Sequence, residues 1–490
     1  MVRDMLLRPA MVARPPSLES KRWLLLPGLL VAAGVGAASA VGPLKALLAL
    51  PVVVIVACVW RWPALAAYLV IGLTPLLVGI NRGAALPLIR PNEALALLVG
   101  FALVTRGIAG LRSGQIPKLR LDRVEVSMVL LAIFSSVVPV VWMTLRQQPM
   151  TQDDLLYALV LWKYLGLYVL VRMAVSTDRQ IQRCLWISVG AAVIVAVLAI
   201  LQSLGLFGVP RILATFYPPF GYSDSGFGAR GSSTLALPAA TADVMVYNLA
   251  IVSGLWMRSR RHRLLLAPAA ALLVVAALSA GEFSSAIGLV VAVVCIALVT
   301  NSARLLRIFL PAGLIASQVL QPVFAARLSG FQSVTGLPIS WTGRLQNLQS
   351  YFWPQLVTNW NVLFGVRPSA RIPVLSQSAG YVWIESGYTW LLWGGGIPLF
   401  ASFVFFVLAT AKRGWQAAHR NAGAASVAGI AAFVAIVVTT VLMTFDPHLT
   451  YRGSADLLFV LIALSAPRLW RPDSAGAPIT PHEITEEARA

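Results

Sequence analysis

Charged residues are scarce in this chain of 490 residues: Asp, Glu, Lys and Arg together make up only 11% of it. Soluble globular chains carry about 25% charged residues. Hydrophobic residues make up 58%, and the mean hydropathy is +0.80. This composition excludes a soluble globular enzyme, a disordered chain and a fibrous repeat. It is typical of a polytopic membrane protein.

Cysteine and histidine are also rare, with three and four residues. Cys58, Cys184 and Cys295 all lie inside apolar runs, which favours small buried side chains over a disulfide, a redox site or a metal site. The chain has no HExxH or DxD sequence and no group of Cys and His. It also has no Gly-Lys dipeptide, and therefore no P-loop. We expect neither a metal nor a cofactor.

Long apolar runs recur along the whole chain. A helix needs about 20 mostly apolar residues to cross the hydrocarbon core of a bilayer. Two of the runs are joined by a short turn at Gly281–Glu282 and the last run is short, so we predict an all-α fold with 12–14 transmembrane helices. The candidate spans are 23–41, 43–60, 62–80, 92–110, 125–145, 154–174, 182–204, 234–257, 264–281, 283–300, 305–322, 387–410, 425–445 and 454–467.

The positive charges predict the orientation of these spans. If the N-terminus is inside, 26 of the 38 Lys and Arg residues fall in inner segments and ten fall in outer ones, while Lys45 and Lys163 lie at or in spans. Cytoplasmic loops collect Lys and Arg, so we expect both termini in the cytoplasm. The predicted segments are an inner tail (1–22), eleven spans with an outer loop at 205–233 (23–322), a large extracytoplasmic loop (323–386), three spans (387–467) and an inner tail (468–490).

The ten outer cations are all arginines, and several of them lie in the two long outer loops. Guanidinium groups bind phosphate with two parallel hydrogen bonds and keep their charge in a dry site. Arg230, Arg344, Arg367 and Arg371 are therefore candidates for an anion site. The alternative for each is a solvated loop charge that contacts lipid headgroups.

The large loop contains an amphipathic pattern after Trp341. Apolar residues recur at helical spacing, and aromatic rings of the kind found at membrane–water interfaces flank them. The pattern predicts a surface helix with Arg344 in its first turn, where a nearby anion would offset the unfavourable helix dipole. The residues of this pattern are Leu345, Leu348, Phe352 and Leu356, with Trp341, Tyr351, Trp353 and Trp360.

Glu385 is the only acidic residue between Glu282 and Asp446. It lies among aromatic residues at the entrance of a predicted span, where desolvation would raise its pKa toward a value useful for a general base. The alternative is a solvated carboxylate at the membrane interface. Further along, Gly394–Gly396 are suited to close helix packing.

Three local patterns together resemble the O-antigen ligase and O-antigen polymerase superfamily of bacterial polysaccharide assembly. The resemblance covers about residues 90–466 and includes the order of the motifs, their predicted side and the many spans. The patterns are Arg230-Gly-Ser-Ser-Thr followed by Pro238, then Gly343-Arg344 with Trp353 and Phe364-Gly365, and finally Glu385-Ser-Gly-Tyr388 with Gly394-Gly395-Gly396.

The chain departs from the family pattern at several positions. Pro238-Ala239 stands where the family has Pro-Asn, and Phe283-Ser284-Ser285 stands where Ser-Arg is often found. Ligases carry a histidine where this chain has Glu385. Since polymerase-type members tolerate other residues there, the resemblance favours a polymerase over a ligase.

The resemblance implies metal-independent glycosyl transfer at the outer face of a bacterial cytoplasmic (inner) membrane. The donor would be a glycan on undecaprenyl diphosphate, and the acceptor a hydroxyl of a lipid-linked glycan or of a lipid core. Membrane lipids, a flippase and a chain-length regulator are the expected partners, with no role for nucleic acid.

The expected roles follow from this chemistry. Glu385 would be the base for the acceptor hydroxyl, and Arg230 and Arg344 would stabilise the leaving diphosphate. A direct displacement would invert the anomeric centre. Further substrate contacts are expected from Arg211, Arg367, Arg371, Tyr388 and Trp353.

Two other classes of function stay open. Lys163 and Asp243 lie near the middle of predicted spans, where charges are costly and often functional. They would suit a transporter or a flippase for lipid-linked saccharide, although we find no inverted repeat and such a protein has little need of a long outer loop. A non-catalytic scaffold for polysaccharide assembly is the third class.

Overall fold

The computed structural model describes residues 43–83, 88–112, 121–218, 230–258, 262–302, 339–374, 380–420 and 423–466, with five single positions between 311 and 325. It consists of two compact units. Unit 1 comprises Met1–Pro63 and Leu98–Ile116, and unit 2 comprises Ala64–Leu97 and Pro117–Ala490. Among its described residues, unit 1 contains one whole helix and most of another, and Arg106 there donates to the backbone carbonyl of Trp60.

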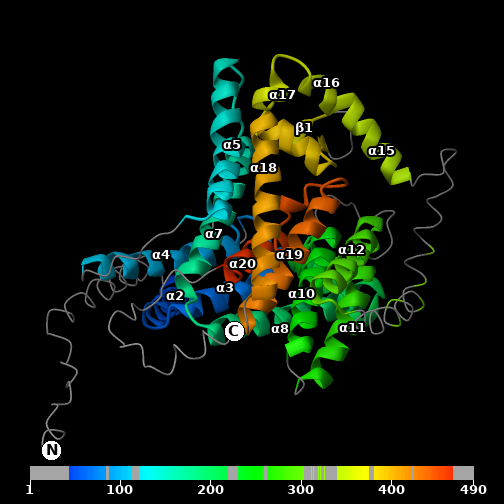
Figure 1. The fold of residues 1–490 in the computed structure, drawn as a ribbon. Helices are drawn as coiled ribbons and strands as arrows, with labels where there is room; N and C mark the ends of the chain where they lie inside the picture. Colours follow the sequence, from blue (N-terminus) through cyan, green and yellow to red (C-terminus); the bar gives the residue numbers. More distant parts are fainter. Residues whose placement is uncertain are drawn as a thin grey trace, which may run out of the picture. The chain divides into compact units, whose positions relative to one another are not determined.

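Helices account for most of the described chain (Figure 1). The elements up to Phe216 are α2 (Pro43–Arg61), α3 (Ala64–Leu77), α4 (Pro91–Arg112), α5 (Arg123–Leu145), α6 (Gln152–Ala158), α7 (Val160–Ala174), α8 (Asp178–Ser203), η1 (Leu206–Gly208) and α9 (Val209–Phe216). The later elements are η2 (Ser233–Leu235), α10 (Pro238–Arg258), α11 (Arg263–Ser279), α12 (Phe283–Thr300), α15 (Ile339–Asn347), the π-helical η5 (Leu348–Phe352), α16 (Trp353–Leu356), α17 (Asn361–Phe364), β1 (Arg371–Pro373), β2 (Tyr381–Trp383), α18 (Gly387–Arg420), α19 (Ala424–Leu442), η6 (His448–Thr450) and α20 (Ser454–Leu464).

Eight of the described helical segments are long and apolar enough to cross a membrane, so the protein is an all-α polytopic membrane protein. The segments are Pro91–Ala109, Arg123–Leu145, Gln152–Ala174, Asp178–Ser203, Pro238–Arg258, Phe283–Thr300, Gly387–Arg420 and Ala424–Leu442. The only described sheet is the antiparallel pair β1–β2. The predicted span 23–41 and most of 305–322 lie outside the described residues.

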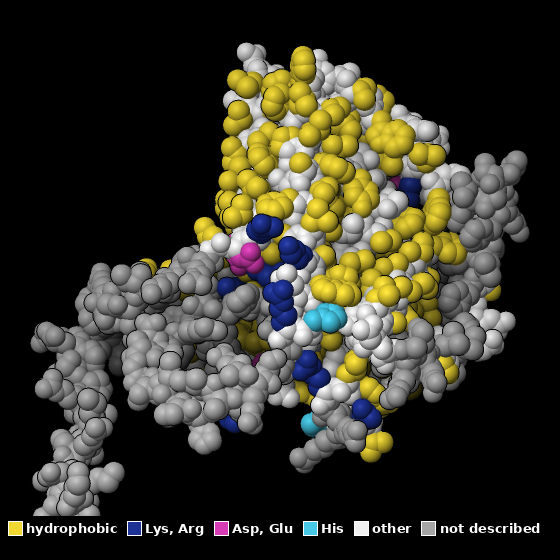
Figure 2. Space-filling model, viewed as in Figure 1, with side chains coloured by type: hydrophobic (Ala, Val, Ile, Leu, Met, Phe, Trp, Pro, Cys, Tyr) yellow, Lys and Arg dark blue, Asp and Glu magenta, His cyan; other side chains and the backbone are white. Residues whose placement is uncertain are grey.

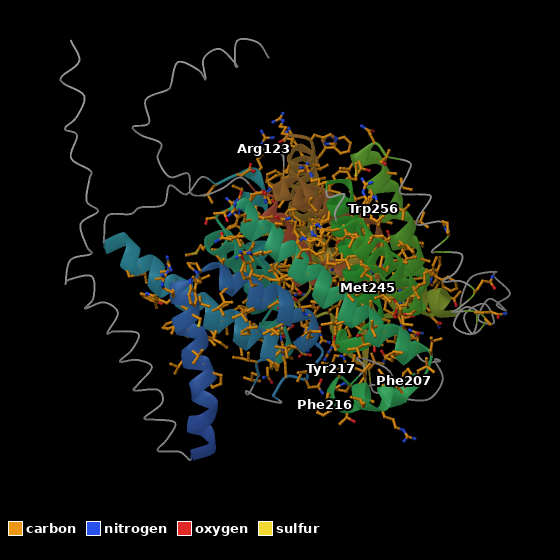
Figure 3. The ribbon with its side chains drawn as sticks, turned by 90° about the horizontal axis from the view of Figure 1, so that it is seen from below. Arg123, Phe207, Phe216, Tyr217, Met245 and Trp256 are labelled. Carbon is orange, nitrogen blue, oxygen red and sulfur yellow. The ribbon has the colours of Figure 1, made fainter. Side chains whose placement is uncertain are left out.

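Helix α10 forms the centre of unit 2. It is buried from Pro238 to Leu255, and it packs against α8, α11, α12 and α19. Small residues permit this close packing: a Cβ atom at Gly254 would lie 2.8 Å from Cγ1 of Val427 on α19. Figure 3 shows Met245, which is fully buried, on α10 among the neighbouring helices.

Helix α18 is interrupted close to its start. Gly396 has φ +66°, and Pro398 follows it, so the backbone hydrogen bonds of a continuous helix cannot form there. The carbonyl of Trp393 accepts a hydrogen bond from the N–H of Val366, at 2.6 Å. A Cβ atom at Gly395 would overlap the carbonyl oxygen of Phe134 on α5, which explains why glycine lies where α18 packs along α5.

Apolar side chains also cover much of the outside of unit 2, as lipid contact requires. Figure 2 shows them over the face around α5 and α18, with basic side chains below. Helix α9 and η1 add exposed apolar groups, among them Phe207 (84% exposed) and Phe216 (62%), which Figure 3 shows near Tyr217. The Tyr217 hydroxyl donates to the carbonyl of Leu76 and so holds this segment against α3.

Candidate functional site

Seven ionisable side chains of unit 2 form a network that we call the polar cluster. They come from widely separated parts of the sequence and are linked by ion pairs and by electrostatic interactions centred on Glu282. The members are Arg230, Asp243, Glu282, Arg344, Glu385, Asp446 and His448.

Arg344 on α15 contacts two carboxylates of the polar cluster. Its Nη1 donates to Oδ2 of Asp446 at 2.7 Å and to the carbonyl of Phe445 at 3.3 Å. Its Nε lies 3.5 Å from Oε1 of Glu385. Burial alone would lower the pKa of Arg344, but the carboxylates of Asp446 and Glu385 outweigh it and raise the pKa. The guanidinium is therefore charged and held in one orientation.

Aromatic packing and a glycine place these groups beside one another. Trp341, on the same helix as Arg344, has its ring 5.2 Å from that of Phe445. The N–H of Gly387 donates to the carbonyl of Met443 at 2.7 Å, and a Cβ atom on Gly387 would overlap the Met443 sulfur. The start of α18 and the end of α19 therefore touch, which brings their neighbours Glu385 and Asp446 to the same guanidinium.

Glu385 is the most accessible and most loosely held carboxylate on Arg344. Its side chain is 29% exposed, against 7% for Asp446. Its Oε2 accepts only a long hydrogen bond of 3.4 Å from Asn347. Burial raises the pKa of Glu385, Arg344 lowers it, Asp446 raises it, and the net shift is upward. This is the direction that a general base requires.

Arg230 and Glu282 form a second ion pair of the polar cluster, with Nη1 and Oε1 3.6 Å apart. Burial raises the pKa of Glu282, and the carboxylate of Asp446 raises it further. Gly231 fixes this part of the chain: its N–H donates to the carbonyl of Ser279, and a Cβ atom there would lie 2.6 Å from the Ser279 hydroxyl. Glycine is thus required by close packing directly after Arg230.

His448 and Asp243 form a buried pair that sequence reasoning did not predict. Nδ1 of His448 lies 2.8 Å from Oδ2 of Asp243, and both side chains are 1% exposed. Burial alone would lower the pKa of His448, but Asp243 raises it and the net shift is upward. The sequence marked Asp243 as an intramembrane charge, but no local pattern joined it to His448.

The second intramembrane charge has a different partner. Nζ of Lys163 on α7 lies 3.4 Å from Oδ1 of Asp456 on α20. Lys163 and Asp243 are therefore each paired, but not with each other.

The other predicted substrate residues lie elsewhere in unit 2. Arg367 bonds to Asp154, and Arg371 lies 3.5 Å from Asp153, so both arginines connect the segment before β2 to α6. Arg211 is exposed on α9. Two aromatic residues contact the spans: Nε1 of Trp353 donates to Thr389, and the hydroxyl of Tyr388 donates to the carbonyl of Thr440.

A helix is present where the amphipathic pattern predicts one, and it differs from the prediction in two details. Helix α15 begins at Ile339, so Arg344 lies in its last turn and the prediction of a first-turn position was wrong. A π-helical turn follows at Leu348–Phe352. Because this turn changes the helical register, Leu348, Phe352 and Leu356 are buried, whereas Leu345 is 46% exposed.

The chemistry available to the polar cluster is that of proton transfer and anion stabilisation. It combines an accessible carboxylate, two guanidinium groups and a buried imidazole. In the described part of the chain, no three His, Cys, Asp or Glu side chains are grouped so that they could hold a metal ion.

Comparisons with models of known protein families, with curated proteins and with solved structures find no match.

Proposed function

We propose that the protein is a membrane glycosyltransferase of the O-antigen ligase and polymerase type. It would transfer or polymerise a glycan from an undecaprenyl diphosphate donor onto a sugar hydroxyl, with a polymerase favoured over a ligase. One observation supports this most directly. Arg230, Arg344 and Glu385 carry the sequence resemblance, lie far apart in the chain, and belong to one polar cluster.

Glu385 is the acceptor base in this proposal. It is the carboxylate that an incoming hydroxyl can reach, and its two contacts, of 3.5 and 3.4 Å, are weak enough to exchange. Asp446 instead keeps the shorter bond and fixes Arg344 in place. The base removes the hydroxyl proton as the acceptor oxygen attacks the anomeric carbon.

Arg344 and Arg230 stabilise the leaving diphosphate. Both guanidinium groups have carboxylate partners that hold them in place before the donor binds. The two guanidinium groups can then offer their positive charge to phosphate oxygens, without a metal ion.

The proposal also includes a membrane topology, which the eight apolar segments alone do not define. Residues 323–386 would face the outside of a bacterial inner membrane as one large loop, and both termini would lie in the cytoplasm. The total would be 12–14 spans. The charge distribution of the sequence supports this arrangement.

A transporter or flippase for lipid-linked saccharide is the second candidate. A pocket between α3, α7, α8, α10 and α20 favours it, because Asp456 lines this pocket together with Thr74, Ser188 and Asn248. Polar groups inside a helical bundle are suited to ion coupling.

The glycan profile of a deletion strain separates the two functions. A strain without a polymerase loses polymer and retains single repeat units, and a strain without a ligase accumulates polymer on the carrier. An unchanged polysaccharide favours transport.

The test of the enzymatic proposal is Glu385→Gln in purified protein, with lipid-linked glycan isolated from the deletion strain as substrate. Loss of a general base should lower turnover about 10²–10⁴-fold. Donor binding, measured separately, should change little, because the base acts in the transition state. Glu93→Gln is the matched control, since Glu93 pairs with Arg82. Wild-type turnover in Glu385→Gln would refute the assignment.

A further inference from the structure

Nε2 of His448 is buried and has no hydrogen-bond partner among the described residues. The opposite nitrogen, Nδ1, bonds to Asp243, so Nε2 points away from α10. A buried polar atom without a partner is costly, and such atoms in native structures call for an explanation. A ligand atom that meets Nε2 when substrate is bound is one such explanation.

The ring of His448 is held in one orientation. Its backbone N–H donates to the carbonyl of Asp446 at 2.8 Å. The Tyr451 ring packs 4.7 Å from the imidazole, and Asp243 fixes the other side through Nδ1. A ring fixed at these three points presents Nε2 in a constant direction, as a group that contacts a reacting atom must do.

The charges around the ring favour the imidazolium form. Asp243 on α10, Asp446 before η6 and Glu282 before α12 all act on His448, and together they raise its pKa. Tyr451 stays neutral, since its pKa is well above 10. The positive charges of the cluster, Arg230 and Arg344, are paired with Glu282 and Asp446. In the imidazolium form both ring nitrogens carry hydrogen, so Nε2 is a hydrogen-bond donor.

We propose that His448, oriented by Asp243, binds an oxygen of the donor diphosphate through Nε2–H and gives that oxygen its proton as the glycosidic bond breaks. The acceptor hydroxyl loses its proton to Glu385, and its oxygen bonds to the anomeric carbon. The bond from that carbon to the phosphate oxygen breaks, and the electron pair stays on the oxygen. His448 is left neutral and regains a proton from solvent. The inference rests on the proposed function and adds a general acid to it.

Inorganic diphosphate is the probe for the binding part of this inference, because it tests the phosphate contact without turnover. Binding to the full-length protein in lipid nanodiscs is measured by calorimetry with EDTA present. At about pH 6, where imidazolium predominates, His448→Gln should weaken binding about tenfold to hundredfold, as expected for a lost charge-assisted hydrogen bond. His419→Gln, on the exposed end of α18, should bind like the wild type.

The pH dependence gives the second readout. The charge on His448 is fully present below pH 6.5 and is lost as the pH rises through its raised pKa. The difference between wild type and His448→Gln should therefore shrink as the pH is raised through this pKa. Asp243→Asn keeps a side chain that can bond Nδ1 but removes the carboxylate charge, so its diphosphate binding should fall off at a lower pH than in the wild type.

The outcomes separate this inference from the proposed function. Wild-type affinity in His448→Gln at about pH 6, with weakened binding in Arg344→Lys, overturns the role of His448 and leaves the arginine site intact. If His448→Gln does not fold, an unshifted pH profile in Asp243→Asn overturns the inference. Unchanged binding in both Arg344→Lys and Arg230→Lys, or no binding by the wild type, refutes the diphosphate site and the inference with it.

Discussion

The contact between Arg367 and Asp154 gives a prediction that does not depend on the function. Asp154 on α6 is completely buried, and it accepts bonds from Nε and Nη2 of Arg367 at 2.9 and 2.5 Å. The N–H of Ser369 adds a third bond at 3.2 Å. This carboxylate therefore connects the segment between α17 and β1 to the spans of unit 2.

Asp154→Asn should destabilise the protein by about 3–5 kcal/mol, the usual cost of removing one partner from a buried charge pair. Asparagine keeps one acceptor oxygen, but its amide group would face the guanidinium, which is only 23% exposed. Asp153→Asn is the matched control. Asp153 is 44% exposed and lies 3.5 Å from Arg371, and exposed pairs of this kind contribute about 0–1 kcal/mol.

The measurement is reversible unfolding in detergent, with a double-mutant cycle that includes Arg367→Met. Because the double variant buries no unpaired charge, it should be more stable than Asp154→Asn alone. A loss below about 1 kcal/mol for Asp154→Asn, equal to that of Asp153→Asn, would show that the buried contact does not hold this segment.

Two further predictions concern the site and its side of the membrane. Arg344→Lys should lose about as much turnover as Arg344→Ala, roughly 10²–10³-fold, because one ammonium cannot contact Asp446, Glu385 and a diphosphate with the geometry of a guanidinium. Arg82→Lys is the control. Full activity at normal protein level in Arg344→Lys would exclude the phosphate role. Thr358 lies on an exposed turn. The variant Thr358→Cys, made in a protein whose three native cysteines are replaced by alanine, should react with an impermeant maleimide in intact cells. Reaction only after lysis would reverse the proposed membrane orientation.

The helical layout could largely be predicted because hydrophobic length alone selects helices in a bilayer. Helix α5 begins at Arg123 and α12 at Phe283, within two residues of the predicted spans. The predicted span 154–174 is divided at Leu159, where α6 ends and α7 begins. Thr151 caps α6 through Asp154, and no hydropathy window registers such a local cap.

The polar cluster could be predicted only in part. Glu385 was identified by its isolation among aromatic residues, Asp243 by its position in a predicted span, and Arg344 by its place in a long outer loop. Their partners depend on tertiary contacts across the chain: Asp243 and His448 are 205 positions apart, and Arg344 and Asp446 are 102 apart. Lys163 likewise has a distant partner, Asp456, which lies at the start of the short helix α20.

The break in α18 makes the shape of this span depend on another part of the chain. The Val366 N–H satisfies the carbonyl of Trp393, which lies just before the break at Gly396. A Cβ atom at Gly396 would overlap the carbonyl of Leu363 on α17. Because an unpaired carbonyl is costly in hydrocarbon, the bend of α18 and the position of the segment after α17 stabilise each other.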